Sequence, residues 1–307
     1  MRVSSNIMFE TGAGRIGDLQ SALNKTMQQI STNRRVLTPA DDAVAAARAL
    51  DVSQAQAVNQ QYGVNRQNAK TSLMMVESTL QGVTPLLHDL KGAIVRAGNG
   101  GLKDSDRASI ATELRGRFDE LLGLANSTDG SGNYLFSGYQ VTTPAFSKTT
   151  AGAQYQGDAE RRQLQVEAAR TMDISDSGQK IFQGDGKPGE DIFKTLQDLI
   201  TLLETPVVDD AGKAKLAADL ATANGNLDKT LDNVLTVRAS IGARLNEIDA
   251  LDDTGSARDI QYQQNLSDLI GLDPVEAYSR LMQQQITLQA AQKAYVSASG
   301  LSLFQYM

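Results

Sequence analysis

The chain has 307 residues, a formal net charge of −7, no cysteine, no tryptophan and a single histidine, His88. Without cysteine, disulfides, thiolate nucleophiles, zinc–thiolate sites and iron–sulfur clusters are all excluded. One histidine excludes a metal site with two histidines of the same chain, and any serine–histidine mechanism would have to use His88. We therefore predict no catalytic, metal or cofactor site, and the acidic balance argues against a nucleic-acid partner.

No segment is apolar over the length that a membrane helix or a signal peptide needs. The longest apolar runs, such as residues 43–47, fall far short of the roughly 20 residues that cross a bilayer. The first ten residues are mixed in polarity. We expect no membrane partner, and a cytoplasmic address unless a route other than general secretion exports the chain.

Apolar residues seven apart predict a helix near the N-terminus. Four residues follow this spacing and a fifth lies between them on the same face: Phe9, Ile16, Leu23, Ile30 and Leu19. Asn33 then suits a left-handed helix end. Thr38-Pro39-Ala40-Asp41 is typical of a helix start, so we expect a second helix to open there. Asp41 and Asp42 are interpreted as acids of its first turn rather than as metal ligands.

The first helix contains Gly12-Ala13-Gly14-Arg15-Ile16-Gly17, which matches the dinucleotide-binding pattern G-x-G-x-x-G. That pattern cradles phosphates only where a buried strand precedes it and a helix follows. Here mixed polar residues precede it, and the seven-residue spacing continues through it. We interpret the segment as helical and the nucleotide hypothesis as the weaker alternative.

Two long apolar seams predict a pair of long helices. The first seam alternates steps of four and three residues from Ala69 to Ala97 and continues through Pro85, which indicates a kinked helix rather than a break. Its members include Leu73, Val76, Leu80 and Leu87. The second seam has steps of seven: Leu220, Leu227, Val234, Ile241 and Ile248. The seams are predicted to pack as antiparallel partners, with a shorter helix over about Ser105 to Asn126 between them in sequence.

The middle of the chain differs from both seams. Seven of the fifteen aromatic residues lie between Tyr134 and Phe193, among many Gly, Asp, Ser and Thr residues. The alternating residues 164–166 and 172–174 predict short strands. Residues 184–189 lack complete nucleotide or calcium motifs and are interpreted as a turn. The fold class is therefore mainly α: an elongated antiparallel helical rod or coiled coil, with a small β-rich insert.

The C-terminal segment repeats the seven-residue spacing, with Leu281, Leu288 and Tyr295 on one face. Asp273-Pro274 predicts its helix start. From Asp273 onward the chain has only four charged residues, and glutamine and serine fill the polar face. An exposed helix usually carries many charges. We therefore expect both terminal segments to be poorly ordered alone and to pack among other chains.

These patterns divide the chain into three parts. Residues 1–40 and 272–307 are expected to form terminal helices as an assembly core. Residues 41–142 and 191–271 are expected to form the helical rod, with a β-hairpin near 133–142. Residues 143–190 are expected to form the β-rich outer insert.

Four segments carry a resemblance to a known family. They are Met1-Arg2-Val3-Ser4, residues 29–42 (QISTNRRVLTPADD), residues 132–139 (GNYLFSGY) and Leu301-Ser302-Leu303-Phe304. Together they resemble the bacterial flagellin superfamily, and within it the proteins of the hook–filament junction. The resemblance spans both terminal thirds and the centre of the chain.

The resemblance implies a structural, non-enzymatic component of the extracellular flagellum that joins hook and filament. Its partners would be the first hook–filament junction protein, flagellin, copies of itself and a cytoplasmic flagellar export chaperone. Export would follow the flagellar type III route, which needs no general signal peptide. Phe9, Ile16, Leu19, Leu23 and Ile30 would meet Leu281, Leu288 and Tyr295 at the assembly interface. Leu301, Leu303 and Phe304 would be chaperone and assembly contacts.

Three alternatives stay open. A flagellin-like filament subunit is the first, although the Met-Arg-Val-Ser start and the short insert favour the junction protein. An extended coiled-coil adhesin or scaffold is the second, but it would have charged terminal helices. An enzyme that uses carboxylates of the insert is the third. It would draw on Asp158, Asp173, Asp176 and Asp185, whose spacing selects no reaction.

Overall fold

Long helices dominate the computed structural model, which describes residues 2–304, and side chains only for residues 7–298. The helices are α1 (Arg2–Thr32), α2 (Ala43–Ala97), α3 (Asp104–Ala125), α4 (Gly178–Gln183), α5 (Ile192–Glu204), α6 (Asp210–Ile270) and α7 (Pro274–Phe304). A 3₁₀ turn covers Gly184–Gly186. In the described residues the strands are β1 (Phe146–Thr149), β2 (Gly152–Tyr155), β3 (Gln163–Glu167) and β4 (Arg170–Asp173). The predicted class, mainly α with a small β-rich insert, is confirmed.

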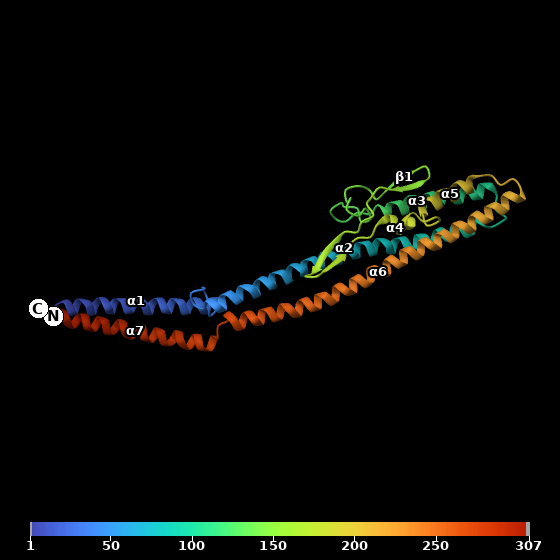
Figure 1. Cartoon of the computed structure of the whole chain (residues 1–307). Coiled ribbons are helices and arrows are strands. Elements are labelled where there is room, and N and C mark those ends of the chain that lie inside the picture. Colours follow the sequence, from blue (N-terminus) through green and yellow to red (C-terminus); the bar gives the residue numbers. More distant parts are fainter. Residues whose placement is uncertain (1, 305–307) are drawn as a thin grey trace. The chain divides into compact units, whose positions relative to one another are not determined.

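The chain forms two compact units. The terminal unit contains Met1–Gln60 and Ser256–Met307, and the central unit contains Gln61–Gly255. In the terminal unit α1 and α7 lie side by side (Figure 1).

Burial between α2 and α6 forms the centre of the central unit. All nine positions of the first seam, from Ala69 to Ala97, are buried, and so are the five positions from Leu220 to Ile248. Full burial of a leucine, valine or isoleucine contributes about 1.5–3 kcal/mol. The helix α2 is continuous through Pro85, as expected.

Ion pairs along α2 and α6 give the direction of the pairing. Successive partners are Arg66 with Asp252, Lys70 with Asp249, Glu77 with Arg238, and Lys91 with Asp228. The numbers fall along α6 as they rise along α2, so the two helices are antiparallel, as predicted. Because most of these pairs are partly exposed, they specify the alignment more than they stabilise it.

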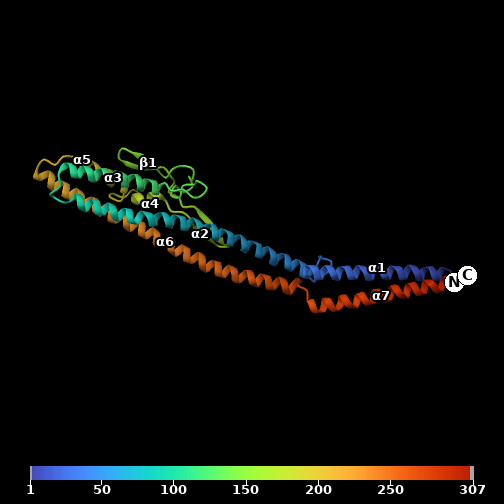
Figure 2. The same ribbon diagram turned by 180° about the vertical axis from the view of Figure 1, so that it is seen from behind.

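A cluster of phenylalanines joins α3 and α5 to the insert. Phe146 of β1 contacts Phe193 of α5 with ring centroids 4.9 Å apart, and Phe193 contacts Phe118 of α3 at 5.6 Å. Phe182 of α4 and Phe136 complete the cluster, and all five rings are buried. Figure 2 shows α3 and α5 side by side in the central unit. The sequence patterns did not single out α5, a strongly amphipathic helix whose apolar face covers this cluster.

The insert contains two small antiparallel sheets. Strand β1 pairs with β2, and β3 pairs with β4 across a bulge between Gln165 and Glu167. The strands predicted at 164–166 and 172–174 are confirmed as β3 and β4, apart from a one-residue difference at Ile174. The buried Arg66 of α2 fixes this hairpin by donating to the carbonyl of Val166 at 3.1 Å.

The hairpin expected near residues 133–142 is not formed. Among the described residues this stretch holds turns and one isolated bridge, between Thr128 and Tyr134. The N–H of Tyr134 still donates to the Val141 carbonyl at 2.8 Å, so the stretch closes as a turn without strands. Gly138 within it has a φ of 66° and lies so close to residues 158–160 that a Cβ would be 2.6 Å from the Asp158 carbonyl oxygen.

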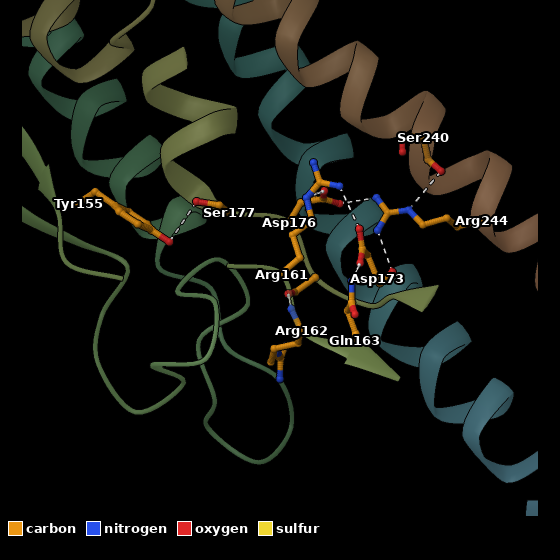
Figure 3. A network of polar contacts seen from close by, with 10 residues as sticks. Tyr155, Arg161, Arg162, Gln163, Asp173, Asp176, Ser177, Ser240 and Arg244 are labelled. Carbon is orange, nitrogen blue, oxygen red and sulfur yellow. Dashed lines mark hydrogen bonds and ion pairs between the residues drawn. The ribbon is translucent and has the colours of Figure 1, made fainter. Parts of the chain in front are cut away.

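A buried polar network attaches the insert to α6 (Figure 3). Asp176 is only 3% exposed and pairs with Arg244 of α6, while Arg161 lies 3.6 Å from it. Arg244 also donates to the Asp173 carbonyl at 2.8 Å. Burial by itself would raise the pKa of Asp173, but hydrogen bonds from Arg161 and Gln163 outweigh it and hold that pKa below its ordinary value. Both carboxylates are thus tied to cations from other segments.

The buried seam of α2 predicts that shortening one of its leucines strongly lowers the free energy of unfolding. Leu80→Ala removes a fully buried side chain and should lower the free energy of unfolding by about 2–5 kcal/mol, because the cavity adds to the lost transfer energy. Urea unfolding monitored by circular dichroism measures it. Val95→Ala is the matched control on the same helix, since Val95 is 72% exposed. Equal losses from the two variants would contradict the seam.

Two arginine ion pairs join the insert to α6, and the network predicts that they contribute unequally to the free energy of unfolding. Arg244→Met leaves the buried Asp176 with one distant partner and should cost about 3–5 kcal/mol. Arg170→Met breaks an exposed pair with Glu247 and should cost at most about 1 kcal/mol. Unfolding free energies and the rate of proteolysis within residues 159–176 compare them. A loss for Arg244→Met no larger than that for Arg170→Met would disprove the anchoring role.

Candidate functional site

The terminal helices α1 and α7 are neighbours, and two of the residues that the seven-residue spacing singled out, Phe9 and Tyr295, are in contact. The rings of Phe9 and Tyr295 meet edge to face, with centroids 6.1 Å apart. At the other end Arg34 and Gly271 form an antiparallel bridge. Steps of seven in opposite directions from Phe9 and Tyr295 then place Ile16 opposite Leu288 and Leu23 opposite Leu281.

Burial along this pair is incomplete. Leu288 is buried, while seven of the eight residues expected at the interface are only half-buried: Phe9, Ile16, Leu19, Leu23, Ile30, Leu281 and Tyr295. The side chains of Leu301, Leu303 and Phe304 lie outside the described residues. One neighbouring helix thus covers only part of this apolar face.

Gly12 has a packing role in the pair. A Cβ at this position would lie 3.0 Å from the Tyr295 ring, closer than ordinary contact, whereas Gly14 and Gly17 have open space beside them. The whole segment lies inside α1, so the strand and turn that a nucleotide cradle requires are missing from it. The glycine pattern is a helical segment, as interpreted from the sequence.

The link between α1 and α2 departs from the expected helix start. Asn33 adopts the predicted left-handed conformation, with φ of 54°. However, α2 begins at Ala43 rather than near Thr38, because the Asp41 carboxylate accepts the backbone N–H groups of Leu37 and Thr38, each at 3.0 Å, and so closes a separate turn. Asp42 instead caps α2 by accepting from the N–H of Ala45 at 2.9 Å.

The Asp41 turn is held by charge. The ammonium of Lys25 on α1 pairs with Asp41, and with the two backbone N–H groups it lowers the pKa of that carboxyl from 3.8 to about 2. Close by, Gln29 donates to the Arg35 carbonyl at 2.6 Å, and the N–H of Arg35 donates to the Ile270 carbonyl at 2.7 Å. These contacts fix the end of α1 against the end of α6.

A second apolar stripe on α7 has no covering partner within the described chain. Its members are 56–81% exposed: Val275, Tyr278, Met282 and Ile286. The sequence analysis missed this stripe, although the steps of three, four and four from Val275 to Ile286 were a signal that could have identified it. Exposed apolar surface of this kind marks an interaction site.

Charge is distributed unequally between the two units. The terminal unit contains nine basic and nine acidic side chains, so the whole net charge of −7 resides in residues 61–255. Like-charge repulsion would therefore not oppose the approach of several terminal units. His88 is exposed on α2. Within the described residues no helix is long and apolar enough to span a membrane, and no group of three or more candidate metal ligands occurs.

Residues 3–141 match the family model "Bacterial flagellin N-terminal helical region". The chain is 42% identical to flagellar hook-associated protein 3 of Escherichia coli (strain K12) over 316 aligned residues, which cover 99% of each chain. The chain belongs to the flagellar hook-associated protein 3 family. Flagellin of Bacillus subtilis (strain 168) is a more distant relative, at 24% identity over 97% of this chain and 96% of its own.

Solved structures agree with this family. A flagellar hook-associated protein from Vibrio parahaemolyticus is 28% identical, with a TM-score of 0.67, and the match covers 75% of this chain and 100% of that one. The sequence supports membership of the family over nearly the full length of the chain, and the fold supports it over three quarters of the chain. The flagellin alternative is less supported, because its identity is much lower.

The Asp41 turn predicts a local pH dependence. Because its pKa is depressed in the folded chain, Asp41 contributes its stabilisation above about pH 4 and loses it as the pH falls from 3.8 towards about 2. Carbon-detected NMR of the carboxyl group should give a midpoint near 2. Lys25→Met should move the midpoint up towards 3.8, because the largest cause of the shift is removed. A wild-type midpoint at 3.8 would show that the turn is not formed.

Proposed function

We propose that this chain is a structural, non-enzymatic subunit of the bacterial flagellum that joins hook and filament. It polymerises as a ring between the first hook–filament junction protein, on the hook side, and flagellin, on the filament side. Membership of the hook-associated protein 3 family supports this role. The observation that carries it in this molecule is the exposed apolar stripe of α7 from Val275 to Ile286.

The stripe supports polymerisation because its apolar side chains are stabilised when another chain buries them. The face of α7 towards α1 is already partly covered, whereas the stripe is exposed and therefore available to a different chain. Burial of one such large side chain contributes about 1.5–3 kcal/mol, and several on one helix would hold a neighbour firmly. Copies of the same chain are the natural first partners, since the terminal unit has no net charge to repel them.

The division into three functional parts belongs to the same proposal. Residues 1–40 and 272–307 would form the assembly core, residues 41–142 and 191–271 the rod, and residues 143–190 the outer insert. The subunit would reach the extracellular flagellum through the flagellar type III apparatus. A cytoplasmic export chaperone would hold the C-terminal segment with Leu301, Leu303 and Phe304. In this proposal the ends of the chain complete their folding only on assembly. The incomplete burial of the α1–α7 pair supports this order.

A substitution on the stripe tests assembly separately from folding. In cells that lack the native gene, Met282→Ser with Ile286→Ser should reduce the number of filaments per hook more than about tenfold, because two apolar anchors are lost. Electron microscopy counts the filaments, and the subunit itself should still be found in the medium. Filaments at normal numbers would overturn the proposal.

Two controls accompany this test. Gln283→Ser with Ala290→Ser changes exposed residues of α7 outside the stripe and should leave filament numbers near normal. Removal of residues 273–307 should abolish filaments altogether. If the control pair were as defective as the stripe pair, the stripe would have no special role.

A further inference from the structure

A small polar cavity in the insert adjoins the Asp176 network and lies outside the terminal unit. Its volume is about 320 Å³, and its lining is polar except for one alanine: Tyr139, Ala159, Glu160, Arg161, Gln163 and Asp173. It lies in the central unit beside the network of Figure 3, where Arg161, Gln163 and Asp173 point toward one another.

Tyr139 is the unusual member of this cavity. Its side chain is 57% exposed, although a tyrosine ring gains most from burial. The turn that carries it is pinned, because Gly138 touches the backbone of residues 158–160 and admits no Cβ there. The ring is therefore held at the rim of the cavity on a fixed backbone, beside the segment that carries Glu160.

The polar groups are held in place by one another. Arg161 Nη1 donates to Asp173 at 3.0 Å, and Gln163 donates to the same carboxylate at 2.9 Å. Arg161 also pairs with Asp176 through Nε. These bonds leave the side-chain carbonyl of Gln163 as an acceptor for a ligand and Arg161 Nη2 as a donor. Such a preorganised set costs little ordering entropy when a ligand binds.

The charges of the lining narrow the ligand class. Arg161 and Asp173 neutralise each other, and Glu160 forms no ion pair with the side chains that the structure describes. An anion would be repelled by Glu160, and a divalent cation would find only one free carboxylate where it needs several oxygen ligands. A hydroxyl group both donates and accepts, so it can use the Glu160 carboxylate, the Gln163 carbonyl and Arg161 together.

The geometry points to a binding site for a neutral sugar ring of the hexopyranose class. The apolar face of the ring would stack on Tyr139, and adjacent hydroxyls would bond to Glu160, Gln163 and Arg161. A shallow site with one aromatic wall and a few hydrogen bonds binds weakly, in the millimolar range. The site is independent of the assembly role, since none of its residues belongs to the terminal unit.

Ligand-observed saturation-transfer NMR on the full chain tests the site. The probes are the methyl glycosides of glucose, galactose, mannose and N-acetylglucosamine, each at millimolar concentration. At least one should receive saturation. Tyr139→Ala should weaken its binding by roughly tenfold or more, because the stacking surface is removed. Gln140→Ala, an exposed neighbour outside the cavity, should change the affinity by less than about twofold.

The same assay distinguishes the rival occupant, a cationic side chain of a partner protein held by Glu160 and Tyr139. N-acetyl-arginine methylamide is the probe for it. Binding of this cation without any glycoside would overturn the inference, as would the absence of binding by all four glycosides. A glycoside that binds equally well to the Tyr139→Ala variant would also overturn it. Circular dichroism melting confirms that each variant is folded.

Discussion

Apolar burial between α2 and α6 is the interaction on which the rest of the central unit depends. Neither helix can cover its own seam, and the residues that complete it lie more than a hundred positions away in the chain. Closing so long a loop costs conformational entropy, and burial of several seam residues offsets that cost. The residues between α2 and α6 in the chain form α3, α5 and the insert. These elements can pack on the surface that the paired helices provide.

The insert is joined to that surface by two different kinds of contact. The phenylalanine cluster supplies non-directional burial between α3, α4, α5 and β1. The network around Asp176 fixes the orientation of the insert, because a buried carboxylate tolerates few arrangements of its cations. Together they explain how two sheets of two short strands, which are marginal alone, keep a defined position in the central unit.

The terminal unit follows a different logic. Its helices pair through half-buried residues and leave a second apolar stripe exposed, while the central unit buries its seam completely. A helix pair of this kind gains only part of its stability within one chain. Under the proposed function, the remainder would come from neighbours in the assembly. The neutral charge of the same unit is consistent with close packing among copies.

Periodicity let the sequence by itself determine the long helices of this protein. The steps of three, four and seven residues define which face of each long helix is apolar, and the helices could bury those faces only by pairing. Asn33 and Asp273 were also readable, since a left-handed helix end and a helix cap are local properties of the backbone. The family resemblance likewise came from short segments that can be recognised without a fold.

Only the tertiary structure decided the features that depend on distant partners. The choice of Asp42 over Thr38 as the cap of α2 followed from a carboxylate that Lys25 draws into another turn. The close contact between Gly138 and the segment near residue 158 could not be predicted from the residues around Gly138. The ring of Tyr295 explains Gly12, and the cavity beside Tyr139 joins segments that show no common pattern in sequence. Such side chains act through space, and local spacing carries no information about their partners.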